Sequence, residues 1–139
     1  MVTTLIASAM LLSNVGLDWL NSNFDTYDKI QKQLYEYAEP GYMEQKSSEL
    51  FIQHLEENGF KVERGVAGMP TAFVASFGSG KPVFAVLAEY DALPGLSQDT
   101  TPENSPLVEG GYGHACGHNL IGTTALSAAV AVSKWLAEG

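Results

Sequence analysis

Three side chains that can bind a metal ion, His114, Cys116 and His118, occur within five residues of one another. They lie in the stretch GYGHACGHNLIG, residues 111–122, between a long loop and the start of a predicted helix. Thiolate and imidazole are good ligands for zinc and similar divalent ions. Because residues two apart in an extended turn point to the same side, Cys116 and His118 are expected to bind together, with Gly117 allowing the backbone to turn.

The next residue, Asn119, is a plausible N-cap of the helix that follows. A thiol beside a helix N-terminus experiences the positive end of the helix dipole, which favours the thiolate form of Cys116. Ordinary structural roles stay open for these residues. A single cysteine is often a buried apolar residue, and a histidine at a loop–helix junction is often only a satisfied structural group. Spacing alone shows two or three ligands, whereas a site needs at least three.

A second group of chemically capable residues, Glu89-Tyr90-Asp91, ends the apolar run of residues 82–89. A nearly continuous apolar run predicts a strand that is buried on both faces. Ligands of open α/β sheets bind outside the carboxyl ends of the strands. On one strand face, Glu89 and Asp91 would lie together, and a carboxylate there could hold the tautomer of a metal-bound imidazole. Alternatively, Asp91 merely begins the turn that residues 92–95 resemble.

Hydrophobic periodicity predicts three helices around these residues. The first covers about residues 17–38 and ends before Pro40-Gly41, and the second covers about 45–58 and ends at Gly59. The third covers about 119–138. The apolar stripe of the first helix is Leu17, Leu20, Phe24, Tyr27, Ile30, Leu34 and Tyr37, and that of the third is Leu120, Thr124, Ala128, Val132 and Trp135.

Between the second and third helices, the sequence predicts strands at about residues 61–65, 71–77 and 82–89, followed by a long loop at 92–113. Helices before and after strands indicate an α/β layered domain. Two or three strands are few for such a domain, so we expect the sequence to be the first part of a longer protein.

The chain has 139 residues, which favours one domain, and 45% hydrophobic with 17% charged residues, which is typical of a globular protein. A net charge of −9 argues against nucleic acid and against an anionic membrane surface as partners. One cysteine excludes a disulfide within the chain. Residues 1–16 are interpreted as an N-terminal segment, and their apolar run at 2–12 is either a docked segment or the remnant of a signal.

Three motifs together resemble a known family: AEPGYMEQKSSE at residues 38–49, EYDALPGLSQ at 89–98 and GHACGHNLIGT at 113–123. They are similar to the aminoacylase/carboxypeptidase-type metallopeptidases. The nearest branch is that of the amidohydrolases, with hippurate hydrolase and the aminobenzoyl-glutamate utilization protein B type. The resemblance implies a zinc-peptidase-like catalytic domain with a helix-flanked mixed sheet, of which residues 17–139 are the N-terminal part, incomplete at the C-terminus.

The same resemblance implies two divalent metal ions, zinc or manganese, in the complete enzyme. Cys116 and His118 match metal ligands of the family, and Asp91 matches its catalytic aspartate, which supports the metal centre. Glu89 stands where the wider family has a histidine ligand, so no ligand role is carried over to it. Asn119 stands where many relatives have aspartate, which leaves the substrate open. The family's general base, its remaining ligands and its lid domain come later in the chain and match no residue here.

We therefore expect a metal-dependent hydrolase that cleaves amide bonds of N-acyl or N-aroyl amino acids or dipeptide-like substrates, of the aminobenzoyl-glutamate or hippurate type. Its partners would be a small-molecule amide and further copies of the complete protein. The expected compartment is the cytoplasm, or the periplasm or exterior if residues 1–15 are a signal remnant. This part alone is expected to be inactive.

Two other classes of function stay open. The first is a thiol hydrolase in which Cys116 is the nucleophile and His114 or His118 the base. The second is a non-catalytic fragment or interaction module. An incomplete sheet has an exposed edge, so we expect the isolated chain to be marginally stable or to self-associate.

Overall fold

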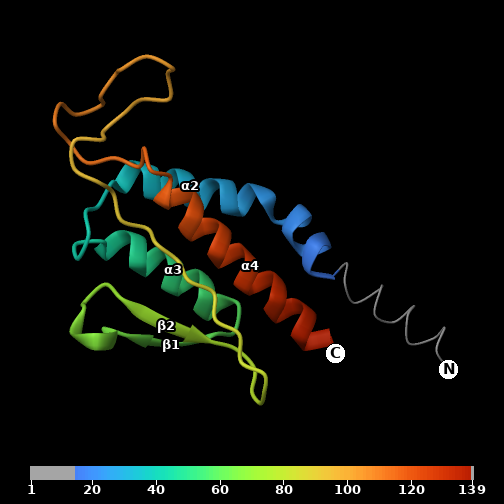
Figure 1. Ribbon diagram of the computed structural model, residues 1–139. Coiled ribbons are helices and arrows are strands. Elements are labelled where there is room, and N and C mark those ends of the chain that lie inside the picture. The colour runs from blue at the N-terminus through green and yellow to red at the C-terminus, as the bar shows by residue number, and fades with distance from the viewer. Residues whose placement is uncertain (1–14, 139) are drawn as a thin grey trace.

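The computed structural model describes residues 15–138, so most of the predicted N-terminal segment 1–16 lies outside the described residues. A short helical stretch at residues 15–22 comes first. It is followed by α2 (Phe24–Tyr37), α3 (Gln45–Glu57), β1 (Lys61–Arg64), a 3₁₀ turn (Val66–Gly68), β2 (Phe73–Ser76) and α4 (His118–Glu138). Figure 1 shows α3 between the β1–β2 hairpin and the pair formed by α2 and α4.

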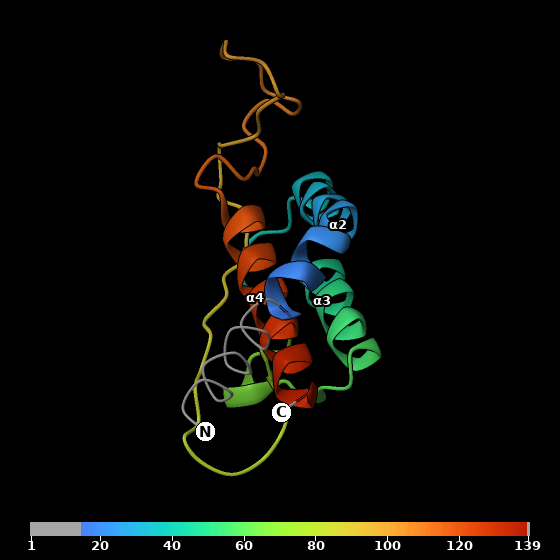
Figure 2. The ribbon, with the colours of Figure 1, turned by 90° about the vertical axis from the view of Figure 1, so that its right-hand side faces the viewer.

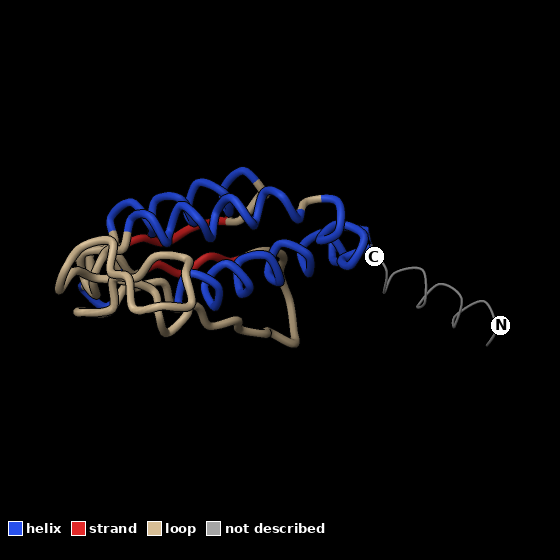
Figure 3. Tube along the Cα trace, turned by 90° about the horizontal axis from the view of Figure 1, so that it is seen from above, coloured by secondary structure: helices blue, strands red, loops and turns tan. Residues whose placement is uncertain are grey.

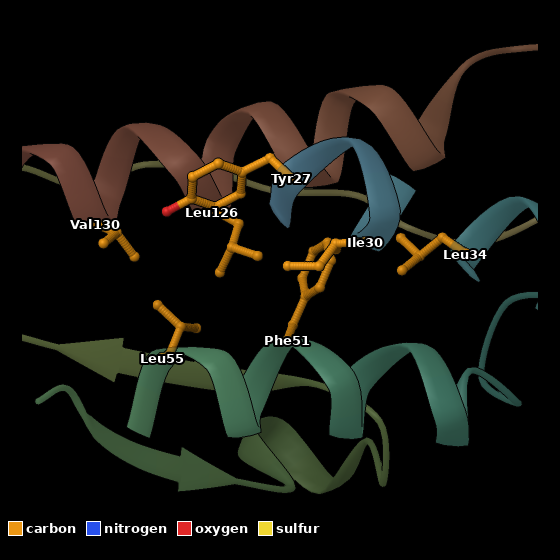
Figure 4. Packing of buried hydrophobic residues seen from close by; sticks show 7 residues of the cluster. All are labelled: Tyr27, Ile30, Leu34, Phe51, Leu55, Leu126 and Val130. Atoms are coloured by element: carbon orange, nitrogen blue, oxygen red, sulfur yellow. The ribbon is translucent and has the colours of Figure 1, made fainter. Parts of the chain in front are cut away.

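The core lies where the three long helices meet (Figure 4). Each helix contributes two or three buried apolar side chains, which are Tyr27, Ile30 and Leu34 from α2, Phe51 and Leu55 from α3, and Leu126 and Val130 from α4. Burial of such side chains stabilises the folded state by about 1.5–3 kcal/mol each. The hairpin covers the other side of α3, and Phe73 and Ala75 of β2 pack against the same cluster.

The predicted first helix is interrupted. A turn at Asn23 separates residues 15–22 from α2, and the Asn23 side-chain amide donates to the Trp19 carbonyl at 2.9 Å. Tyr27, Ile30 and Leu34 of the predicted stripe are buried, but Leu17 and Phe24 are exposed. The helix ends at Tyr37, where Ala38 adopts a left-handed conformation and donates its N–H to the Leu34 carbonyl.

The predicted inward stripe of α4 is wrong. Leu120, Val132 and Trp135 are exposed, whereas the opposite face, with Leu126 and Val130, is buried. That inward face also carries Gly122, Thr123, Ala131 and Ser133. Small side chains allow a helix to approach its neighbours closely. The close packing of this face is favoured over burial of the larger apolar side chains on the other face. By length and composition α4 could cross a membrane, but here its inward face packs on α2 and α3.

The described residues form only one sheet, the antiparallel pair β1–β2, with Val62 opposite Ala75 and Glu63 opposite Val74. The predicted strands at 61–65 and 71–77 are thus confirmed, each shortened to four residues. The architecture is compatible with the α/β class, although the expected helix-flanked mixed sheet is not formed within residues 15–138.

The predicted buried strand at 82–89 is wrong. This segment runs as an extended strap alongside α4 (Figure 2), with no strand paired to it among the described residues. Its side chains are exposed, Phe84 to 87% and Leu87 to 90%. The apolar pattern reports a tendency to be buried, but burial of a central strand needs neighbouring strands on both edges. The loop at 92–113 is confirmed, and Figures 2 and 3 show it at one end of the molecule.

Candidate metal site

His118 and the two carboxylates predicted from the sequence meet at the N-terminal end of α4. The His118 Nδ1 atom lies 2.9 Å from Asp91 Oδ1 and 3.0 Å from the Asp91 carbonyl oxygen. On the other side of the ring, Nε2 lies 3.3 Å from Glu89 Oε2. One ligand atom from each of the three residues falls within 4.8 Å of the others.

The hydrogen bond to Asp91 determines which ring nitrogen is available. Two oxygens of Asp91 lie within 3.0 Å of Nδ1, closer than Glu89 lies to Nε2, so we assign the proton of the neutral imidazole to Nδ1, which donates it to Asp91. Nε2 is then an unprotonated donor atom that faces the Glu89 carboxylate. The His118 side chain is 12% exposed and that of Glu89 65%, so the site is open to solvent on the Glu89 side. Imidazole nitrogen and carboxylate oxygen together suit zinc or manganese.

Backbone hydrogen bonds fix the segment that carries Asp91. The Ala92 N–H donates to the Glu39 carbonyl at 2.7 Å, and Leu93 exchanges two hydrogen bonds with Gly113. A Cβ atom at Gly113 would lie 2.0 Å from the Leu96 carbonyl oxygen, so only glycine allows this approach. Backbone hydrogen bonds therefore hold the Asp91 segment to the α2–α3 connection and to Gly113, the first residue of the GHACGH motif.

Tyr90 points away from the two carboxylates and anchors them. Its hydroxyl donates to the Thr71 carbonyl at 2.5 Å, and the Thr71 hydroxyl donates to Glu44 Oε2 at 2.6 Å. Its ring stacks on Phe73 and meets Phe51 edge-on. Burial, with a contribution from the Glu44 charge, raises the pKa of Tyr90 to about 12, so the hydroxyl stays protonated.

Gly117 provides the turn that places His118 at the start of α4. Its φ of +86° lies in the left-handed region, and its N–H donates to the His114 carbonyl at 2.8 Å. The Gly117 carbonyl accepts from Leu120 and Ile121. The helix thus begins at His118, and the predicted N-cap role of Asn119 is wrong. Asn119 is buried inside the first turn, and its amide donates to the Gln31 side chain at 3.0 Å.

His114 is not part of the cluster. It is buried against α2, with Nε2 3.0 Å from the Leu34 carbonyl and Nδ1 without a hydrogen-bond partner. Burial holds its pKa below the ordinary value. Neutral His114 therefore donates from Nε2 to Leu34 and ties the GHACGH motif to α2.

Cys116 lies outside the group of His118, Asp91 and Glu89. Its side chain is exposed, while His118 turns inward, because the backbone reverses at Gly117 between them. Within residues 15–138 no hydrogen bond joins Cys116 to His114 or His118, so the arrangement gives no support to a thiol nucleophile activated by histidine. The proposed metal-ligand role of Cys116 stays a prediction.

Glu89 is the member of the cluster to which the sequence assigned no ligand role. The available signal was the spacing in Glu89-Tyr90-Asp91, since extended residues two apart share a side. In the structure both carboxylates do face His118, even though the segment is not paired into a sheet.

Comparison with known proteins adds sequence relatives to this geometry. None of the protein-family models compared with the chain matches it. One of the subunits of the p-aminobenzoyl-glutamate hydrolase of Escherichia coli is 45% identical over 122 residues, which are 87% of this chain and 25% of that protein. Thermostable carboxypeptidase 1 of Saccharolobus solfataricus is 39% identical over 93 residues, 66% of this chain and 23% of that protein. An IAA-amino acid hydrolase of Arabidopsis thaliana is 36% identical over 107 residues, 76% of this chain and 24% of that protein.

These relatives are amidohydrolases and carboxypeptidases, and the chain belongs to their family. The family predicted from the three sequence motifs is thereby confirmed. The chain spans about a quarter of the length of the curated relatives that it matches.

Proposed function

We propose that the protein containing this chain hydrolyses the amide bond of an N-acyl or N-aroyl amino acid with the help of divalent metal ions. The names of the relatives support the reaction class, since they include a p-aminobenzoyl-glutamate hydrolase and an IAA-amino acid hydrolase. The observation that carries the proposal is the Asp91–His118 hydrogen bond, which leaves His118 Nε2 facing Glu89.

The residues present fit a metal ion. His118 would contribute Nε2 and Glu89 a carboxylate oxygen, with Cys116 as the further ligand that the family resemblance implies. Asp91 would keep the proton on Nδ1 and hold the ring in place, which increases the basicity of Nε2. Zinc suits a set with thiolate and imidazole, and manganese suits the carboxylates.

A bound metal ion supplies a water molecule of lowered pKa and polarises the scissile carbonyl. The residues of this chain bind and orient, and none of them is assigned the role of general base. In the family that role belongs to a glutamate beyond the motifs present here. We therefore propose that residues 17–139 hold one part of the catalytic site, and that the complete site needs further polypeptide.

The proposed partner is a small amide, of the aminobenzoyl-glutamate or hippurate type, and we expect the complete protein to form homo-oligomers. The net charge of −9 disfavours nucleic acid as a partner. The proposed compartment is the cytoplasm.

The test uses the native protein purified from its source and follows release of p-aminobenzoate from p-aminobenzoyl-glutamate. We expect hydrolysis that a strong chelator abolishes and that zinc or manganese restores. Activity that survives the chelator but disappears with a thiol alkylator would replace the metal mechanism by one based on Cys116. Absence of hydrolysis with all N-acyl and N-aroyl amino acids tested would refute the substrate class.

A further inference from the structure

Glu44 carries a buried carboxylate close to the candidate metal site. It is 8% exposed, and within residues 15–138 no lysine, arginine or histidine forms an ion pair with it. Residues 1–14 and 139 contain none of these three residue types. Among the described residues, its side chain accepts a hydrogen bond from the Thr71 hydroxyl, at 2.6 Å from Oε2. This chain alone buries Glu44, so further polypeptide would add little contact to it. A buried charge without a cationic partner is unfavourable for folding and points to another role.

Capping of α3 does not account for the Glu44 side chain. Glu44 occupies the N-cap position of this helix, but its side chain forms no capping hydrogen bond. The Glu39 carboxylate caps the helix instead. It accepts from the backbone N–H groups of Lys46 at 3.0 Å and of Ser47 at 2.8 Å, and from the Ser47 hydroxyl at 2.8 Å. The role of an acidic residue at this helix end is thus already filled by Glu39.

A chain of hydrogen bonds leads from Glu44 to the segment of the metal site. Thr71, which donates from its hydroxyl to Glu44, accepts at its carbonyl from the Tyr90 hydroxyl at 2.5 Å. Tyr90 lies between Glu89 and Asp91 in the sequence. Burial is the larger cause of the raised pKa of Tyr90, and the Glu44 charge is the second. Glu44 therefore acts on the segment that carries both carboxylates of the site.

The Glu44 carboxylate also lies close to that of Asp91. Glu44 Oε1 is 4.0 Å and Asp91 Oδ2 is 3.9 Å from the position that a Cβ atom at Gly41 would take. The other oxygen of Asp91, Oδ1, is the one that accepts from His118. Asp91 thus has one oxygen toward the imidazole and the other on the side of Glu44.

We propose that Glu44 is a positioning residue of the metal site, and that its buried negative charge behind Asp91 increases the affinity of the site for a divalent cation. This inference rests on the proposed function, since it requires His118 and Glu89 to bind the metal ion. Charges interact more strongly in the protein interior than in water, because the effective dielectric constant is lower. Glu44 therefore favours the metal-bound chain, whereas its unpaired charge disfavours the metal-free fold.

Two substitutions separate the charge of Glu44 from its hydrogen bond. Glu44→Gln removes the charge but keeps an oxygen that accepts from Thr71, whereas Glu44→Asp keeps the charge but is shorter by one methylene and loses that hydrogen bond. A purely structural role through Thr71 would make the aspartate variant the more harmful one. The proposal makes the glutamine variant the more harmful one for metal binding. The control is Glu63→Gln, which removes an equal charge from an exposed position on β1.

The affinity of the full chain for zinc is measured by competition with a chromophoric chelator, and the stability of the metal-free chain by urea unfolding. We expect Glu44→Gln to weaken zinc binding by about tenfold, because an interior charge near the cation is lost. Its urea midpoint should be unchanged or higher, because an unpaired buried charge is removed. Glu44→Asp and Glu63→Gln should both bind zinc within about threefold of the unmodified chain.

Equal zinc affinities of Glu44→Gln and Glu63→Gln would overturn this inference and leave the metal site itself intact. The inference would also be overturned if Glu44→Asp bound zinc as weakly as Glu44→Gln, or if Glu44→Gln lowered the urea midpoint, since either result would make the role of Glu44 structural. Absence of zinc binding by the unmodified chain would overturn the proposed metal site and this inference together.

Discussion

At the scale of single residues, the central feature is the imidazole of His118 held between two carboxylates. Asp91 accepts the Nδ1 proton at 2.9 Å, and Glu89 lies 3.3 Å from Nε2. A carboxylate that hydrogen-bonds a metal-bound histidine fixes its tautomer and ring orientation. Asp91 is thus a positioning residue for His118, and Glu89 lies on the side where a ligand would be bound.

Replacement of Asp91 by asparagine tests this positioning role. Asp91→Asn keeps the size of the side chain but removes the charge, so it should reduce zinc affinity by about 10–100-fold. The measurement is competition with a chromophoric chelator. The control is Asp25→Asn in the exposed first turn of α2, which should bind zinc as the unmodified chain does. Equal affinities for the two variants would remove Asp91 from the site.

A second prediction concerns His54, which lies far from the site along the chain. Burial lowers its pKa below the usual 6.5, Glu57 raises it, and Lys134 lowers it. In acid the unfolded chain therefore binds a proton at His54 before the folded chain does. The contribution of His54 ionisation to the free energy of unfolding is zero at pH values well above 6.5. It becomes unfavourable as the pH falls below 6.5.

His54→Gln should therefore reduce the loss of stability between about pH 7.5 and pH 5.5, as measured by urea unfolding of the metal-free chain. Part of the loss should persist, because burial also lowers the pKa of His114. An identical pH dependence in variant and unmodified chain would show that the His54 pKa is the same in both states.

The residue types of the site could be predicted from the sequence, but their geometry only in part. The Asp91–His118 interaction follows from the two motifs and is present. Cys116 was expected to bind a metal ion together with His118; it is exposed and lies outside the group of His118, Asp91 and Glu89, so its ligand role stays a prediction. The roles of His114 and Asn119 depend on contacts with α2, which no local pattern contains.

At the scale of the elements, Gly122 determines how closely α4 approaches its neighbours. A Cβ atom there would lie 2.5 Å from the Glu89 carbonyl oxygen and 3.1 Å from the Phe51 ring. Alanine in a helix is favoured over glycine by about 1 kcal/mol, but a forced shift of packed groups costs about 1–3 kcal/mol. We expect the steric cost to be the larger, because one of the contacts is with backbone.

Gly122→Ala should accordingly lower the free energy of unfolding, and it should also displace Glu89 from His118. Thr124→Ala, on the exposed side of the same helix, is the control and should leave stability unchanged or slightly higher. Thermal unfolding followed by circular dichroism compares the two. A stabilised Gly122→Ala variant would contradict the close approach of α4 to the Glu89 segment.

Tyr90 links the segment that carries Glu89 and Asp91 to Thr71, which lies just before β2. Tyr90→Phe removes the hydroxyl that donates to the Thr71 carbonyl and should cost about 0.5–1.5 kcal/mol. Urea unfolding measures this loss, with Tyr112→Phe on the exposed loop as the control. If both variants have the same stability, the Tyr90 hydroxyl does not anchor the segment.

The elements show where periodicity is informative and where it is not. The boundaries of α3 and of the β1–β2 hairpin follow the sequence closely, because glycine and proline mark them. For α4, apolar residues occur on both faces, so hydrophobicity could not select the inward one. For residues 82–89, the pattern identifies a segment suited to burial but cannot supply the neighbouring strands.

At the scale of the whole molecule, three helices and a hairpin form a small core and present the candidate metal site at the N-terminal end of α4. Two apolar surfaces are left exposed, the outer face of α4 and the strap at 82–89. The matched residues cover only about a quarter of the length of the relatives. The proposed active site would accordingly be one part of a larger arrangement, whereas the proposed binding of a metal ion by His118 can be tested on this chain.

The most direct test is calorimetric titration of the full chain with zinc and with manganese. We predict binding that His118→Gln weakens by about a hundredfold or more, because a ligand nitrogen is lost. His54→Gln, a histidine variant outside the site, should bind as the unmodified chain does. Equal affinity in His118→Gln and the unmodified chain, or no binding by the unmodified chain, would contradict the assignment of His118, Asp91 and Glu89 as a metal site.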